Sequence, residues 1–132
     1  MKEVLDTRFL RECFSPSQKE SNQKLARKLQ ALTNNNEGIL PTIVIAEITQ
    51  ITCALQGKDI AKSRCQALIQ SGLEIQDLTV EIAQQAGLLK CANPNLPMGD
   101  CIIAATALLN HARVLSDDLH FDSIKEIKRT WI

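Results

Sequence analysis

The sequence predicts a three-layer α/β/α architecture with a mostly parallel central sheet, built as a single domain over residues 1–132. Stretches typical of strands alternate with stretches typical of helices along the chain, an order characteristic of parallel α/β sheets. The run from Arg113 to Ser116 is nearly continuous in apolar side chains, as expected for a central strand buried on both faces. The 132 residues are 45% hydrophobic, which is enough for one core of ordinary size.

The N-terminal part of the chain supplies two expected strands and two expected helices. Leu25, Leu29 and Leu32 recur at helical spacing and define the apolar face of one helix. A break at residues 15–17 precedes this helix and offers a serine as its N-cap. The expected elements are a strand over residues 3–5, a helical turn over 7–13, a helix over 18–32 and a strand over 38–41.

The segment IVIAEITQITCAL, residues 43–55, carries conflicting signals. Its β-branched side chains favour a strand, whereas thirteen residues without a turn favour a helix. Thr42 is a suitable N-cap and Gly57 a suitable C-terminal stop, so we expect a helix between them.

The C-terminal part continues the alternation of helices and strands. Thr79 is expected to cap one helix, and Asp100 is expected to open the most apolar helix of the chain. The expected elements are a helix over residues 59–70, a strand over 73–78, a helix over 80–91, a helix from 100, a strand over 113–116, and a short helix with an edge strand within 124–132.

The composition excludes some functional classes. The formal net charge is zero, so no global basic field attracts nucleic acid, and any such binding needs a local patch or a metal ion. No apolar run reaches the ~18 residues of a membrane span. Residues 1–10 lack the charged segment followed by an apolar segment that is typical of a signal peptide. The five cysteines form no CxxC pair, and Cys53 and Cys101 lie in apolar surroundings. We therefore expect a cytoplasmic protein with free, buried thiols and no membrane partner.

Acidic residues occur where the expected strands end and the following helices begin. Asp6 follows the first strand, Asp117 and Asp118 follow the strand from Arg113, and Asp100 opens a helix. Glu47 lies about one turn into its helix. Because functional sites of parallel sheets lie beyond the carboxyl ends of the strands, these carboxylates are expected to converge.

Such a cluster needs a cation, because like charges a few ångströms apart disfavour joint ionisation. The candidate ligands are all hard carboxylate oxygens, which suit Mg²⁺ or Mn²⁺ better than zinc. A metal held in this way, with waters left in its coordination shell, suits hydrolysis of a phosphodiester.

Four segments carry a resemblance to a known family: VLDTRFL, PTIVIAEI, LPMGDCIIAATAL and VLSDDLHF. Each is weak alone, but together they match in order and spacing the motifs of PIN-domain ribonucleases, and they most resemble the VapC toxins of toxin–antitoxin pairs. The resemblance covers essentially the whole chain.

The resemblance implies four catalytic, metal-binding acids: Asp6, Glu47, Asp100 and Asp118. It also implies three supporting residues beside them: Thr7, Ser116 and Asp117. Asp117 falls on a variable position of the motif, so Asp118 is preferred as the ligand. Ser116 replaces the commoner threonine, and Arg8 stands where the family often has asparagine or serine, with either a phosphate contact or a surface position as its role.

The function implied by the resemblance is that of an Mg²⁺- or Mn²⁺-dependent endoribonuclease, a toxin that leaves 5′-phosphate and 3′-hydroxyl ends. The implied partners are an RNA substrate, a small antitoxin that occludes the site, and a second copy of the chain in a homodimer. A PIN nuclease that matures RNA without an antitoxin, and a non-catalytic PIN binding module, are the alternatives.

Other interpretations of single residues remain. Asp100 alone could be a helix cap, and His111 and His120 are expected at the surface or in structural roles. A phosphoacceptor receiver domain would need an acidic pair after the first strand, and a haloacid-dehalogenase phosphatase would need D-x-D there, where this chain has Arg8. Two basic groups are interpreted as solvated faces, with an RNA path as the alternative: Lys24, Arg27 and Lys28, and Lys58, Lys62 and Arg64.

Overall fold

A five-stranded sheet forms the centre of the computed structural model, which describes residues 1–15 and 19–132, with only the backbone described for residues 19–22. The strand order is β3-β2-β1-β4-β5, and all four pairs of neighbouring strands are parallel. The strands are β1 (Glu3–Leu5), β2 (Gly38–Pro41), β3 (Glu74–Gln76), β4 (Arg113–Leu115) and β5 (Arg129–Thr130).

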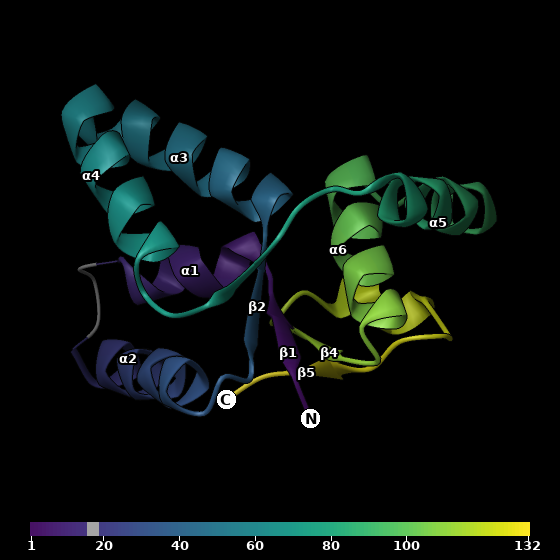
Figure 1. Ribbon diagram of the computed structural model, residues 1–132, viewed down its shortest axis with the longest axis horizontal. Helices are drawn as coiled ribbons and strands as arrows, with labels where there is room; N and C mark the ends of the chain where they lie inside the picture. The colour runs from purple at the N-terminus through teal and green to yellow at the C-terminus, as the bar shows by residue number, and fades with distance from the viewer. Residues whose placement is uncertain (16–18) are drawn as a thin grey trace.

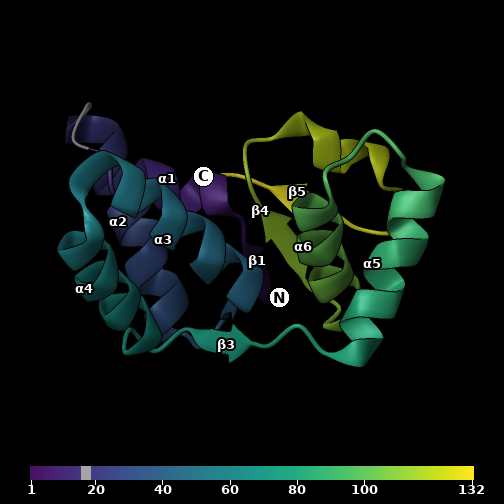
Figure 2. The ribbon, with the colours of Figure 1, turned by 90° about the horizontal axis from the view of Figure 1, so that it is seen from above.

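Helices cover both faces of this sheet (Figures 1 and 2). The helices α1 to α4 lie on one side of it, and α5 and α6 lie on the other. The predicted three-layer α/β architecture is therefore confirmed. The helices are α1 (Thr7–Cys13), α2 (Lys19–Asn34), α3 (Thr42–Gln56), α4 (Lys58–Ile69), α5 (Val80–Ala92) and α6 (Met98–Leu109), with a 3-10 helix, η1 (Leu119–Ser123), before β5.

The core is centred on β1 and β4, which pair with each other in the middle of the sheet. Val4, Leu5, Val114 and Leu115 have no exposed surface. This burial on both faces explains why neither strand alternates between apolar and polar residues. The carboxyl ends of these two strands are consequently fixed by the best-packed part of the protein.

Several expected helix ends are confirmed. Thr79 caps α5 by accepting a hydrogen bond from the backbone N–H of Ile82 at 3.1 Å. Gly57 ends α3 with φ +93°, a conformation that favours glycine. The ambiguous segment after Thr42 is helical, because its apolar side pattern and length outweigh its β-branched composition. The expected break at 15–17 and helix start at 18 fall mainly on residues 16–18, outside the described residues.

Two predicted N-caps are wrong. α3 begins at Thr42 itself with Pro41 as its N-cap, and α6 begins at Met98 with Pro97 as its N-cap. The proline ring fixes φ near the extended conformation of an N-cap residue, so each helix starts directly after its proline. Asp100 is therefore the third residue of α6 and does not cap it, which leaves its carboxylate free for other contacts.

The expected helix within residues 124–132 is also wrong, whereas the edge strand there is confirmed as β5. The short helix lies earlier, at η1, because the Asp118 side chain accepts a hydrogen bond from the backbone N–H of His120 and starts the turn. All five cysteines are free, and Cys101 is buried, but Cys53 is exposed. The buried face of α3 runs through Val44, Ile48 and Thr52, and Cys53 follows it on the outer side.

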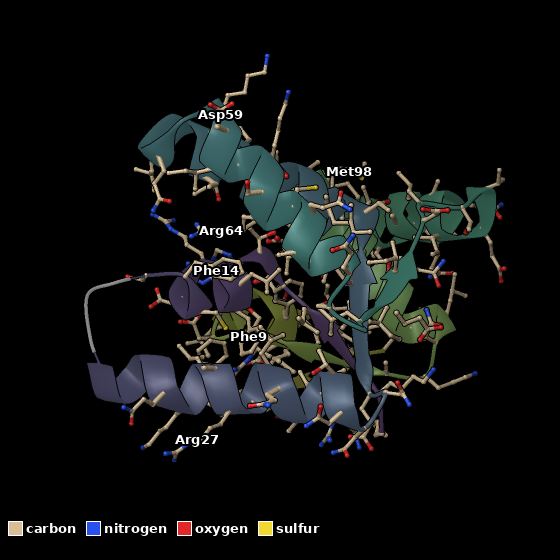
Figure 3. All side chains as sticks on the ribbon, turned by 60° about the vertical axis from the view of Figure 1, so that its left-hand side comes forward. Phe9, Phe14, Arg27, Asp59, Arg64 and Met98 are labelled. Carbon is tan, nitrogen blue, oxygen red and sulfur yellow. The ribbon has the colours of Figure 1, made fainter. Side chains whose placement is uncertain are left out.

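The basic groups differ in their surroundings. Arg27 points away from the core on the outer side of α2, whereas Arg64 lies over the ring of Phe14, 4.5 Å from its centroid (Figure 3). Lys28 forms an ion pair with the buried carboxylate of Glu3 at 2.7 Å and is therefore not merely solvated. Within residues 1–15 and 19–132, none of the helices combines the length and apolarity needed to cross a membrane.

Glycine substitutions provide a test of the packing between β2 and its neighbours. A Cβ atom at Gly38 would lie 2.5 Å from Cδ2 of Leu73 and 3.2 Å from Cβ of Leu32. We expect Gly38→Ala to lower the free energy of unfolding by about 1–3 kcal/mol, because the core must shift to admit the methyl group. Urea denaturation measures the change.

The matched control is Gly87→Ala in α5, where, apart from its chain neighbours and the backbone of its own helix, no heavy atom of the described residues lies within 4 Å of the new Cβ. We expect this variant to be more stable by about 0.5–1 kcal/mol, because alanine loses less backbone entropy in a helix. A Gly38→Ala variant as stable as the parent would contradict the close packing at β2.

Candidate active site

Four carboxylates gather at the carboxyl edge of the sheet, where α1 and α3 begin as β1 and β2 end (Figure 1). Asp6 directly follows β1, and Asp118 lies just beyond β4. Glu47 lies in the second turn of α3, and Asp100 in the first turn of α6. Each of Asp6, Glu47 and Asp118 raises the pKa of Asp100 through its charge, so the four lie within electrostatic reach. We call these four residues the acid cluster.

Asp6 is held by hydrogen bonds to both of its oxygens. Its Oδ1 accepts the backbone N–H of Thr7 at 2.8 Å, and its Oδ2 accepts the hydroxyl of Ser116 at 2.7 Å. The same hydroxyl oxygen accepts the backbone N–H of Asp118 at 3.0 Å. Ser116 is fully buried, so one hydroxyl joins the end of β1 to the turn after β4. Burial raises the pKa of Asp6, the two hydrogen bonds oppose this, and the charges of the neighbouring acids add to it.

Glu47 is positioned by Thr7 and Gly99. The hydroxyl of Thr7 donates to Oε1 of Glu47 at 2.8 Å, linking the start of α1 to α3. A Cβ atom at Gly99 would lie only 3.2 Å from Oε2 of Glu47, so the missing side chain lets the first turn of α6 approach this carboxylate. Sequence analysis did not single out Gly99. The available signal was its position directly before Asp100 in the segment LPMGDCIIAATAL.

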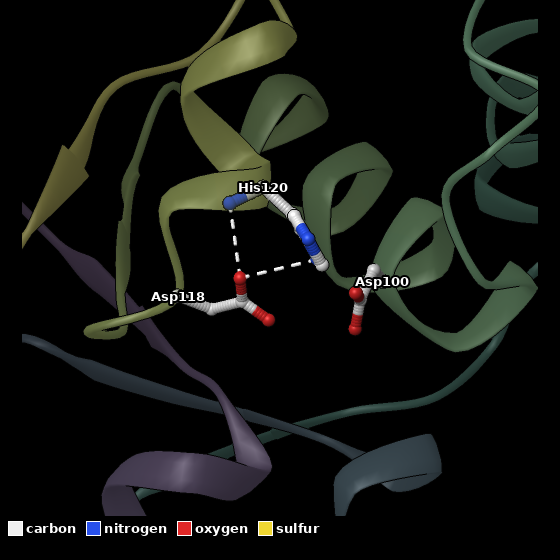
Figure 4. A group of neighbouring side chains, drawn as sticks. All are labelled: Asp100, Asp118 and His120. Atoms are coloured by element: carbon white, nitrogen blue, oxygen red, sulfur yellow. Dashed lines mark hydrogen bonds and ion pairs between the residues drawn. The ribbon is translucent and has the colours of Figure 1, made fainter.

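Asp100, Asp118 and His120 form a compact group within the site, with one potential ligand atom of each within 4.8 Å of the others (Figure 4). Nδ1 of His120 lies 3.3 Å from Oδ1 of Asp118, and the same oxygen accepts the backbone N–H of His120 at 2.9 Å. His120 is exposed, as expected, but it also lies against the acids, a position that sequence analysis missed. Its place two residues after Asp118 was the only signal.

Asp117 faces a different partner. Nε of Arg8 donates to Oδ1 of Asp117 at 2.6 Å, an ion pair exposed to solvent at the rim of the site. Asp118 approaches Asp100 while Asp117 is engaged by Arg8, and the preference for Asp118 as the ligand stays a prediction. The hydrogen bond to Asp117 and the nearby carboxylates raise the pKa of Arg8 and so keep it charged.

The electrostatics of the site suit a hard divalent cation. Burial and the charges of the other three acids raise the pKa of Asp100 from 3.8 to about 6. Such mutual repulsion is relieved when a cation lies between the carboxylates. The donors are carboxylate oxygens with one imidazole beside them, a set dominated by the ligands that Mg²⁺ and Mn²⁺ prefer. The residues present therefore fit such an ion, with carboxylate oxygens of Asp100 and Asp118 within 4.8 Å of each other.

A family model described as the PIN domain matches residues 4–127. No curated protein sequence matches the chain significantly. Among solved structures, the fold is similar to a chain of VapBC2 from Rickettsia felis bound to a DNA fragment from their promoter. That match has a TM-score of 0.80 and 20% sequence identity, and it covers 99% of this chain and 98% of the other.

Two further solved structures extend the likeness. DNA-bound VapBC from Salmonella typhimurium matches with a TM-score of 0.81 and 16% identity, covering 99% of this chain and 98% of the other. VapC20 from Mycobacterium tuberculosis, described as a toxin that cleaves the sarcin–ricin loop, matches with a TM-score of 0.73 and 13% identity. It covers 94% of this chain and 95% of the other. At these identities the likeness concerns the fold.

Replacing Asp100 tests the repulsion within the acid cluster. The folded protein binds the Asp100 proton more tightly than the unfolded chain, because the pKa is raised from 3.8 to about 6. This contribution to the free energy of unfolding therefore decreases as the pH rises from about 4 to about 6. In EDTA at pH 7 we expect Asp100→Asn to melt at a higher temperature than the parent, and at pH 4 the two to melt alike.

Thermal melting followed by circular dichroism measures this effect. Adding Mg²⁺ at pH 7 should stabilise the parent more than the variant, because the cation binds the folded acid cluster. The matched control is Glu126→Gln, which removes an exposed carboxylate outside the cluster and should leave the melting temperature nearly unchanged. An Asp100→Asn variant less stable than the parent in EDTA at pH 7 would contradict the repulsion.

Proposed function

The chain belongs to the PIN-domain family, and we propose that it is an Mg²⁺- or Mn²⁺-dependent endoribonuclease acting through the acid cluster. The observation that carries this proposal is the approach of Asp100 and Asp118 within 4.8 Å, with Asp6 and Glu47 in electrostatic reach. A carboxyl whose pKa is raised by neighbouring acids at the edge of a sheet, as for Asp6 and Asp100, is typical of functional sites, because such repulsion is costly without a ligand.

In the proposed site, Asp6, Glu47, Asp100 and Asp118 hold the metal. The chemistry supplied by a divalent cation at such a site is activation of a water molecule and screening of phosphate charge. Ser116 keeps Asp6 oriented through its hydroxyl, and Thr7 does the same for Glu47. These bonds reduce the reorganisation of the carboxylates when a substrate arrives.

We also propose that the protein is the toxin of a toxin–antitoxin pair, with RNA as substrate, a small antitoxin as partner and a homodimeric state. The support is the likeness in fold, over nearly the whole chain, to proteins solved as VapBC complexes. The likeness to VapC20, described as cleaving the sarcin–ricin loop, supports structured or looped RNA as the substrate class. Exposed bases in loops are also the usual targets of sequence-specific RNA recognition.

The first experiment is cleavage of an end-labelled RNA pool by purified protein. We expect cuts with Mg²⁺ or Mn²⁺, none in EDTA, and a loss of more than about 100-fold in rate for Asp100→Asn, since even residues that only orient metal ligands contribute about 10–100-fold. Glu126→Gln, purified in parallel, should cut like the parent and controls for contaminating nucleases. Cleavage that persists in EDTA or in Asp100→Asn would rule out the metal-dependent mechanism at this site.

A second experiment tests the toxin assignment. Induced expression of the parent in a bacterial host should arrest growth, and the Asp100→Asn variant at equal protein level should not, because arrest requires RNA cleavage. Colony counts and total-RNA sequencing after induction measure both effects. Metal-dependent cleavage in vitro without growth arrest would favour the alternative of an RNA-maturing PIN nuclease without an antitoxin.

A further inference from the structure

A hollow lies directly beside the acid cluster, between the loop that leads into α6 and the helix η1. Its volume is about 450 Å³, and we call it the side pocket. The side chains that matter for its chemistry are Asn93, Asn95, Leu96, Leu119, His120 and Ser123. The proposed cleavage reaction does not use this pocket.

Each wall of the side pocket adjoins a segment that carries one acid of the cluster, Asp100 or Asp118. The loop enters α6 at Met98, two residues before Asp100, and η1 begins directly after Asp118. His120 belongs to both places, because it lines the side pocket and its ring reaches toward Asp118 and Asp100 (Figure 4). Anything bound in the pocket is therefore held in a fixed relation to the acids.

Hydrogen bonds hold the loop wall to the end of α5. The amine of Lys90 donates to the carbonyl oxygens of Pro94 at 2.7 Å and of Leu96 at 2.5 Å, which fastens the loop to the end of α5. The backbone N–H of Leu96 donates to the carbonyl of Asn93 at 3.1 Å, and the Leu96 side chain is buried. Asn95 is consequently presented from an ordered loop. The side-chain amide of Asn95 has no hydrogen-bond partner within residues 1–15 and 19–132.

The lining selects an uncharged, flat ligand. Among the residues that the structure describes, no lysine, arginine or carboxylate lines the pocket, so none of them offers a phosphate group a counter-charge there. Leu119 is 68% exposed and, with the His120 ring, offers a surface against which a planar ring can pack. The Asn95 amide supplies both a donor and an acceptor, as the edge of a nucleobase requires.

We propose that the side pocket binds the base of a nucleotide adjacent to the cleaved phosphodiester, and that Asn95 reads the edge of that base. The charged backbone then faces the acid cluster while the neutral base occupies the neutral hollow beside it. This inference rests on the proposed ribonuclease function and gives it a site of sequence preference. The pocket walls adjoin the segments that carry Asp100 and Asp118, so the preference concerns one position next to the cut.

The test combines a side-chain deletion with a base deletion. The parent and Asn95→Ala cleave a single-stranded RNA library, and end sequencing gives the base preference at each position around the cut. We expect Asn95→Ala to reduce the preference at one position about 3- to 10-fold, the effect of one lost hydrogen bond. On RNA that is abasic at that position, the two proteins should cleave at equal rates. Asn34→Ala, an exposed asparagine at the end of α2, is the matched control.

A binding experiment makes the outcome independent of cleavage. In the Asp100→Asn background with EDTA, fluorescence anisotropy measures the affinity for intact and abasic RNA. Leu119→Ala should weaken binding of the intact RNA at least about 3-fold and leave the abasic RNA unaffected. Base-dependent binding without any cleavage by the parent would support base binding in the side pocket and contradict the proposed ribonuclease function. Three results would overturn the proposed base-binding role of the side pocket. They are metal-dependent cleavage with the same base preference in Asn95→Ala as in the parent, equal effects of Leu119→Ala on intact and abasic RNA, and no binding of RNA.

Discussion

Confinement of like charges dominates this structure. The acid cluster places four carboxylates at one edge of the sheet, and burial with mutual repulsion raises the pKa of Asp100 to about 6. The protein offsets part of this cost with dipoles. Ser116 and the backbone of Thr7 donate to Asp6, and Asp100 lies in the first turn of α6, where the helix dipole favours negative charge. The remaining repulsion is what a bound cation would relieve.

The strand order makes this confinement possible. β1 lies between β2 and β4, so the segments that follow these three strands emerge next to one another. Because the neighbours are parallel, their carboxyl ends share one edge, and residues distant in sequence meet there. The hydrogen bond between Ser116 and Asp6 spans 110 positions of the chain. The fully buried Leu5 and Leu115 end β1 and β4, so their packing helps to fix the positions of Asp6 and Ser116, which follow them.

Sequence patterns anticipated the features that depend on strand ends and failed where local geometry decides. Asp6 and Asp118 follow strands, and any parallel sheet places such residues at one edge. The starts of α3 and α6 were misjudged because Thr42 and Asp100 were expected to cap them, whereas Pro41 and Pro97 occupy the N-cap positions. The approach of His120 to Asp118 depends on the 3-10 turn between them, which leaves no periodic signal in the sequence. The catalytic roles themselves stay predictions.

The arrangement separates two tasks that oppose each other electrostatically. A metal site requires concentrated negative charge, whereas recognition of a base requires a neutral surface with directed hydrogen bonds. Here the loop before α6 supplies Asn95 and the first turn of α6 supplies Asp100, while the segment after β4 supplies Asp118 and then Leu119. Each segment thus contributes a charged residue to the acid cluster and an uncharged residue to the side pocket. Because Lys90 fastens this loop to α5, the position of Asn95 depends on α5 as well as on α6.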